Sequence, residues 1–261
     1  MSSEITPTMH EYLQLLDLTY EVAQSLKGKS LDDHRWPDIQ QLALKLFYHA
    51  ASIYFLRLGT KVPVPYSTGQ GAFFYDLASV TVLARAALET YLTMFEVFFE
   101  PTTEDDFEFN HALWLLSGFK IREDFIPTDP ELQERIVSSQ EEIQEMRDRL
   151  AKTEKFKALS KSQKKDVLMG FRRRPRSNVA QAAGFGEEFI RRVYGYYSGY
   201  VHADGLSGTQ LFSLKTGQEQ TEFIENHMRT VMIILSKMIL DGCISQIVST
   251  NVRIILPRVE S

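Results

Sequence analysis

Two short polar patterns on otherwise apolar segments contain the residue types needed for acid–base chemistry on a phosphate. Arg85 and Glu89 are four residues apart in the first pattern, and Ser198 and His202 are four apart in the second. A histidine titrates near neutral pH and suits general acid–base catalysis. An arginine can stabilise a pentacoordinate phosphate, and a carboxylate can orient either group. These residue types are therefore candidates for general acid–base catalysis, assisted by a cation and a carboxylate.

The first pattern lies in the segment Gly71–Glu100, which is apolar on nearly every side and long enough for a helix of several turns. Such a helix belongs in the middle of a bundle or in a membrane, and its internal charges favour the bundle. Arg85, Glu89 and Glu96 fall on one stripe at 100° per residue. A structural ion pair between Arg85 and Glu89 explains the same spacing, so this alternative stays open.

The second pattern lies in the segment Glu187–His202, which is predicted to be a helix. Arg191 and Ser198 share one face with the histidine that ends the segment, and Tyr194 and Tyr197 flank that face. These tyrosines and Arg191 are candidate substrate-binding residues, and Ser198 could hold a phosphate. Alternatively, the histidine caps its own helix C-terminus as a cation and Ser198 bonds back to a carbonyl.

Periodic apolar positions predict further helices, and the fold class expected is an all-α bundle of about six or seven helices. The predicted segments are Thr8–Leu26, Asp38–Leu58, Glu104–Leu115, Glu131–Leu150 and Gln218–Ser249. The strand-like runs Thr209–Leu214 and Val252–Leu256 could form one short β pairing. Val231–Val248 has the length of a membrane span, but Lys237 and Asp241 near its middle indicate a core helix.

Charge separates along the chain between two neighbouring segments. Residues 104–149 contain 13 acidic and 5 basic residues, a balance of −8, and residues 152–176 contain 10 basic and 2 acidic residues, a balance of +8. We therefore expect one domain, residues 1–261, with residues 128–176 as an inserted charged arm. The basic loop 172–176 either pairs locally with an acidic helix or contacts RNA or a phosphate.

Composition limits the other classes of function. The formal net charge of −5 argues against binding to nucleic acid or an anionic membrane held mainly by charge. The single Cys243 excludes an intramolecular disulfide and a cysteine-rich zinc site, and it suits a reducing cytoplasm. No two of the six histidines are three or four residues apart, so we expect no metal and no cofactor. The N-terminus lacks the pattern of a secretory signal, and no DNA-binding motif is evident.

The paired signatures Arg85-x-x-x-Glu89 and Tyr194-x-x-x-Ser198-x-x-x-His202 resemble those of a family of uncharacterised bacterial all-helical proteins. They are also distantly similar to HEPN helical bundles, many of which are metal-independent ribonucleases or nucleotidyltransferase partners in toxin–antitoxin and phage-defence systems. The resemblance covers about residues 72–100 and 187–249. It implies a protein that acts on or binds RNA in a stress or defence system.

The chain departs from the HEPN pattern in one respect. HEPN ribonucleases carry arginine and histidine on one helix with four to six residues between them, and no such spacing ends at His202. The resemblance therefore implies that Arg85 supplies the cation from the other helix. The alternative is a non-enzymatic helical interaction module, or a homo-oligomer, that associates through the tyrosine-rich helix or the charged arm.

Overall fold

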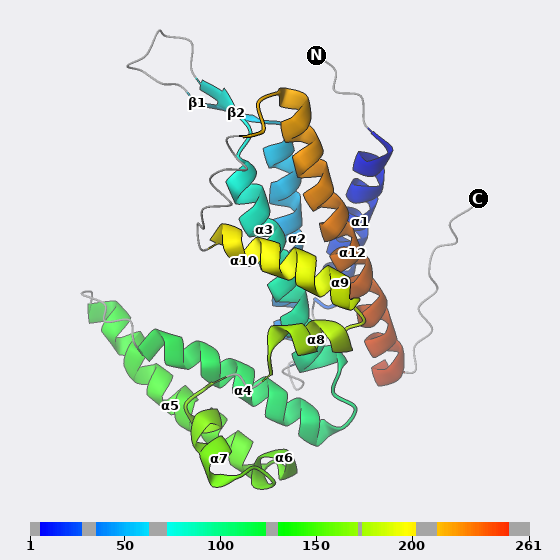
Figure 1. Cartoon of the computed structure of the whole chain (residues 1–261). Helices are drawn as coiled ribbons and strands as arrows, with labels where there is room; N and C mark the ends of the chain where they lie inside the picture. Colours follow the sequence, from blue (N-terminus) through cyan, green and yellow to red (C-terminus); the bar gives the residue numbers. More distant parts are fainter. Residues whose placement is uncertain are drawn as a thin grey trace. The chain divides into compact units, whose positions relative to one another are not determined.

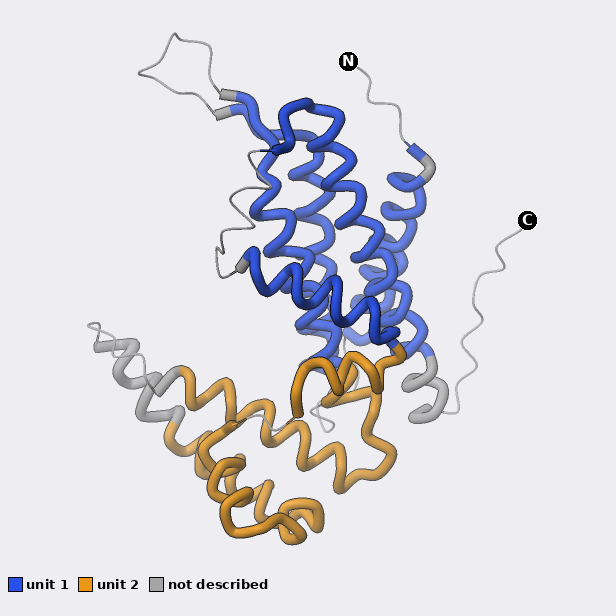
Figure 2. Tube along the Cα trace, viewed as in Figure 1, with its two compact units in different colours: residues 1–94, 185–261 blue, residues 95–184 orange. Residues whose placement is uncertain are grey.

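The computed structural model describes residues 6–27, 35–62, 72–123, 130–171, 174–201 and 213–250. In these residues the protein is all-α apart from one short antiparallel sheet (Figure 1), which confirms the predicted fold class. The chain divides into two compact units (Figure 2): unit 1 is Met1–Met94 with Phe185–Ser261, and unit 2 is Phe95–Gly184. The expected arm, residues 128–176, lies within unit 2.

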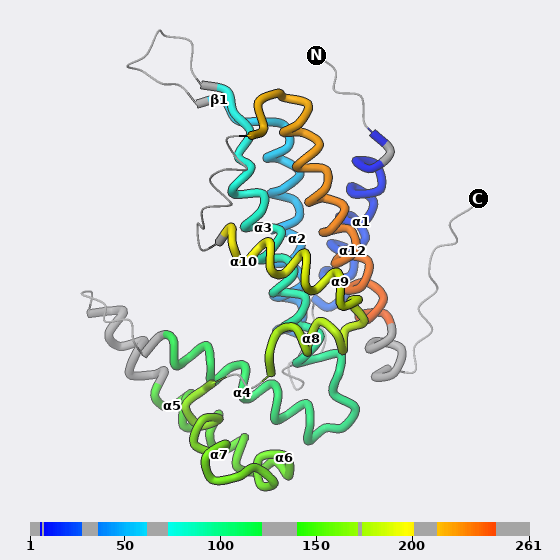
Figure 3. Tube along the Cα trace, in the orientation of Figure 1, coloured from blue at the N-terminus to red at the C-terminus, as the bar shows by residue number. Residues whose placement is uncertain are grey.

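The long helices of unit 1 lie side by side as a bundle (Figure 3): α1 (Pro7–Ser25), α2 (Arg35–Arg57), α3 (Leu77–Met94) and α12 (Gly217–Thr250). Helices α2 and α12 both pack on α3, and α1 packs on α2 and α12. Their facing side chains are fully buried, among them Leu46, Ile53, Leu88, Leu92 and Met228. The helical periods of the sequence therefore mark the core faces of this bundle.

Helix α3 begins later than the sequence predicted. Residues Ala72–Phe74, which lie within the predicted helix, form strand β2, and this strand pairs antiparallel with strand β1, Thr60–Val62. The helix then starts after Asp76, whose Oδ1 accepts the backbone N–H of Ser79 at 3.0 Å. An aspartate that accepts a free N–H of the first turn is a favoured helix start, so Asp76 and the hairpin together set this boundary.

The segment before α12 was predicted as one helix, Glu187–His202. The structure has three consecutive pieces there, α9 (Glu187–Phe189), the π-helix η2 (Ile190–Tyr194) and α10 (Gly195–Val201). Helix α10 packs against α3. The segment that carries Ser198 therefore packs against helix α3, which carries Arg85 and Glu89.

The C-terminal expectations are only partly within the described residues. The predicted pairing of residues 209–214 with 252–256 lies outside them except for Ser213 and Leu214, and neither of these two is in a strand. The apolar run predicted as a core helix belongs to α12, where Val231, Leu235 and Met238 are buried. None of the helices in the described ranges is long and apolar enough to cross a membrane.

Unit 2 has a hydrophobic core of its own. The π-helix η1 (Phe95–Phe99) is followed by α4 (Glu104–Glu123), α5 (Pro130–Lys152), α6 (Glu154–Lys157), α7 (Lys161–Leu168) and α8 (Arg176–Ala182). Helix α4 packs along α5, and α6 packs on both. The core contains Leu116 of α4, Ile143 and Leu150 of α5, and Phe156 and Val167 of the short helices. Residues 154–182, which include most of the basic segment, thus form several short helices.

Candidate functional site

The first polar pattern forms an ion pair on α3. Arg85 Nη2 lies 3.7 Å from Glu89 Oε1, and the two side chains are 18% and 29% exposed. A distance of 3.7 Å is too long for a hydrogen bond. The pair is therefore electrostatic, as the structural alternative predicted, but it leaves the donors of the guanidinium available.

Tyr194 of η2 holds the arginine from the other side. The Cζ atom of Arg85 lies 5.1 Å from the centroid of the Tyr194 ring, within the range of a cation–π contact. Arg85 Nη1 is buried and has no hydrogen-bond partner among the residues that the structure describes. Arginine carries five N–H donors in a planar fork, so this guanidinium is positioned by charge and by a ring face while retaining capacity to bind an anion.

The remaining predicted residues of the second pattern occupy different environments. Ser198 is half-buried on α10, whereas Arg191 is exposed on η2. Tyr197 is only 3% exposed, and its ring stacks on that of His227 with 5.6 Å between centroids. Burial raises the pKa of Tyr197 well above its usual range, so the hydroxyl stays protonated. His202 lies outside the described residues, and its distance from Arg85 is therefore not defined.

A second histidine, which sequence reasoning missed, lies beside the stripe that carries Arg85. His227 of α12 is 6% exposed, its Nδ1 lies 2.8 Å from the carbonyl oxygen of Phe223, and its Nε2 lies 3.2 Å from Thr81 Oγ1. Burial lowers the pKa of His227, and the bond to Phe223 opposes that shift only in part. Thr81 is one turn before Arg85 on α3, so His227 fixes the bundle next to the candidate site.

The predicted acidic and basic segments do attract each other inside unit 2. Lys155 Nζ of the basic segment lies 3.1 Å from Asp106 Oδ1 of the acidic segment. Two further basic residues pair with carboxylates that precede the acidic segment, and Arg174 contacts Glu100. Arg176 Nη1 lies 3.1 Å from Glu96 Oε2. Local pairing therefore accounts for Arg174 and Arg176, whereas Arg172 and Arg173 lie outside the described residues.

The expectation of no metal site also took the chain to lack a Glu-x-x-His spacing, but Glu108 and His111 on α4 have this spacing, which is typical of metal sites in helical bundles. Here Glu108 Oε2 binds Arg149 Nη2 at 2.8 Å, and His111 Nδ1 lies 3.1 Å from the same nitrogen. A guanidinium thus lies where a metal ion would otherwise balance the carboxylate. Within the described ranges, no group of three or more His, Cys, Asp or Glu side chains is arranged to hold a metal ion.

Helical periodicity selected Arg85 and Glu89 because they share one stripe, and Tyr194 because it flanks the face of the second pattern. It could not find His227, since only the packing of α12 on α3 brings this histidine to Thr81, 146 residues away. The function must be argued from this geometry alone, because no family model, no curated protein and no solved structure matches the chain.

Proposed function

We propose that the cluster on α3, η2 and α10 binds a phosphate of RNA and supports its metal-independent cleavage. The observation that carries this proposal is Arg85, whose buried Nη1 has no hydrogen-bond partner in the described part of the chain. A buried donor without a partner costs free energy, and a phosphate oxygen would satisfy it with a strong, charge-assisted hydrogen bond. Tyr194 and Glu89 hold the guanidinium in place while it does so.

The two helices supply complementary parts of the proposed reaction. Arg85 would bind the non-bridging phosphate oxygens and stabilise the charge that develops on them. His202, which follows α10 by one residue, would remove the proton from the attacking 2′-hydroxyl and return a proton to the leaving 5′-oxygen. Ser198 would hold the phosphate, and Glu89 would orient the arginine. The products are a cyclic phosphate and a free 5′-hydroxyl.

The test compares RNA cleavage by the wild-type chain with cleavage by His202→Ala in the presence of EDTA. We expect the substitution to reduce the rate about 10²–10⁴-fold, the usual contribution of a general acid–base group, with an unchanged far-UV circular dichroism spectrum. The matched control is His10→Ala, which changes an exposed histidine on α1. Equal cleavage by wild type and His202→Ala, or no cleavage by wild type, would overturn the proposal and leave the helical interaction module.

A further inference from the structure

Unit 2 contains a pocket that is distinct in position and chemistry from the Arg85 cluster. Its volume is about 580 Å³, and η1, α4, α6 and the start of α8 contribute to its lining. Apolar and aromatic side chains, including Val97, Phe109, Leu113 and Trp114, line one part of it. Pockets of this size with apolar walls and a few converging polar groups are the usual binding sites for small molecules.

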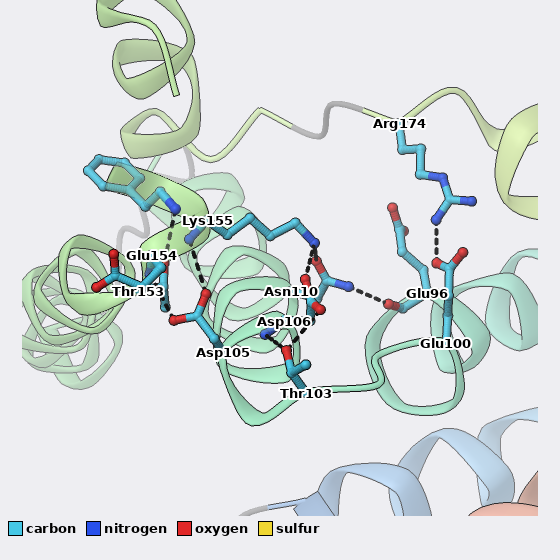
Figure 4. Close-up of polar contacts among 11 residues, drawn as sticks. Glu96, Glu100, Thr103, Asp105, Asp106, Asn110, Thr153, Glu154, Lys155 and Arg174 are labelled. Carbon is cyan, nitrogen blue, oxygen red and sulfur yellow. Dashed lines mark hydrogen bonds and ion pairs between the residues drawn. The ribbon is translucent and has the colours of Figure 1, made fainter. Parts of the chain in front are cut away.

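The polar part of the lining contains charges of both signs (Figure 4). Lys155 reaches from α6 to α4, where its Nζ lies 3.1 Å from Asp106 Oδ1 and 3.4 Å from Asn110 Oδ1. Arg174 contacts Glu100 on the opposite side. Each of these two cations thus already has a carboxylate beside it, so the pocket as a whole has no strong excess of positive charge.

Glu96 is the carboxylate of the pocket with the most restricted surroundings. Its side chain is 14% exposed and is paired with Arg176, which is not part of the lining. Burial raises the pKa of Glu96 in spite of the opposing effects of Arg176 and Arg174. The two arginines therefore compensate only part of the cost of desolvating this carboxylate, and a further cation beside it would be stabilising.

The backbone of Glu96 is also held in place. It lies in the π-helix η1, a rare conformation that is often found at functional sites. Its carbonyl oxygen accepts a hydrogen bond from Asn110 Nδ2 at 2.8 Å. In Figure 4 the carboxylates of Glu96 and Glu100 both extend toward Arg174, so a negative and a positive group stand next to each other at the pocket.

We propose that this pocket binds a free α-amino acid with an apolar side chain, whose ammonium contacts Glu96 and whose carboxylate contacts Arg174. In such a ligand the two charged groups are on one carbon, as the adjacent positions of Glu96 and Arg174 require. Its side chain would cover Leu113 and Trp114, which gives apolar burial a share of the affinity.

Charge excludes the simpler ligands. A nucleotide would bring two or more negative charges beside Glu96, Glu100 and Asp106, and like charges in a partly dry site repel strongly. Glu96 already has a counterpart in Arg176, and Arg174 has one in Glu100, so a ligand with a single charge of either sign would add an unbalanced charge to the pocket. A zwitterion adds no net charge and matches both. The proposal concerns unit 2 alone and does not depend on RNA cleavage.

The first experiment uses the full wild-type chain and isothermal titration calorimetry. L-Phenylalanine, L-leucine and L-tryptophan are tested beside phenylalaninamide, which keeps only the ammonium, and N-acetylphenylalanine, which keeps only the carboxylate. We expect at least one of the three amino acids to bind. Phenylalaninamide and N-acetylphenylalanine should each bind at least about tenfold more weakly than phenylalanine. An analogue that binds as tightly as phenylalanine, or no binding by any of the three amino acids, overturns the proposal.

The second experiment assigns each charged contact to its residue. Glu96→Gln should weaken the binding of the amino acid and of phenylalaninamide by about tenfold, while the affinity for N-acetylphenylalanine stays unchanged. Arg174→Gln should weaken the binding of the amino acid and of N-acetylphenylalanine, while the affinity for phenylalaninamide stays unchanged. Glu188→Gln and Arg192→Gln, which alter an exposed ion pair outside unit 2, are the matched controls. Equal weakening by these controls, or no selective loss in either pocket variant, would contradict the assignment.

Discussion

At the scale of single residues, His227 shows how burial decides the protonation state of a group. Aromatic rings surround it, with Phe223 at 4.4 Å, Tyr197 at 5.6 Å and Tyr196 at 6.1 Å between ring centroids. Burial among these rings removes the water that would solvate an imidazolium. The pKa of His227 is therefore lowered from its ordinary value of 6.5, and the ring is neutral at pH 7.

We predict that His227 makes the stability of the protein sensitive to acid. Its folded-state pKa lies below the unfolded value, so its contribution is present above pH 6.5 and is lost as the pH falls through the folded-state pKa. The difference in the free energy of unfolding between wild type and His227→Gln should decrease as the pH is lowered from 7.5 to 5. Urea denaturation at each pH measures it, with His10→Gln as the control. A wild-type advantage that is constant with pH would refute this prediction.

Single residues also show the limit of sequence reasoning. The Arg85–Glu89 pair was predictable because both residues lie on one helix with a spacing of four. The contact of Tyr194 with Arg85 follows from the packing of α10 on α3, which the sequence does not specify. The same holds for Glu96, whose partner Arg176 is 80 residues away in the chain. Local spacing predicts local pairs, and tertiary packing determines the others.

At the scale of elements, the long helices were predictable and their ends were less so. The apolar period of α1, α2, α5 and α12 extends over several turns, so each was recognised within a few residues of its bounds. The start of α3 was missed because Ala72–Phe74, which continue the apolar run of the predicted helix, pair with β1 as strand β2. The π-helices η1 (Phe95–Phe99) and η2 (Ile190–Tyr194) were not predicted, because the expected positions were placed at 100° per residue on an uninterrupted α-helix.

We predict that the hairpin of β1 and β2 depends on Gly59. This glycine has a φ of 75°, and a Cβ built on it would lie 2.3 Å from Cζ of Phe73. Gly59→Ala should therefore destabilise unit 1 by more than about 1 kcal/mol, since the backbone is strained and the ring must move. The control is Gly195→Ala in α10, where a Cβ meets open space and should be neutral or stabilising. Urea denaturation of both variants measures the difference, and equal effects would contradict it.

At the scale of the whole molecule, composition marked a charged arm where the structure has a complete packing unit. The predicted arm began at residue 128, after the helix predicted over Glu104–Leu115, although the charge segregation of the sequence already starts at residue 104. The core of unit 2 also requires Phe109, Leu113 and Leu116 of α4, which precede that boundary. Charge describes the surface of a segment, whereas a packing unit is defined by the apolar side chains that meet inside it.

The core of unit 2 predicts that residues 95–184 fold without the rest of the chain. Leu116 and Leu150 are fully buried within this unit, and Ser160 and Gln163 form a capping box at the start of α7. A fragment of this length with its own core is large enough for a stable domain. We expect a helical circular dichroism spectrum and a cooperative urea transition. Leu116→Ala should lower its unfolding free energy by about 2–5 kcal/mol, whereas Gly118→Ala, on the exposed side of α4, should not lower it. A fragment that unfolds without cooperativity would show that unit 2 depends on unit 1 for its stability.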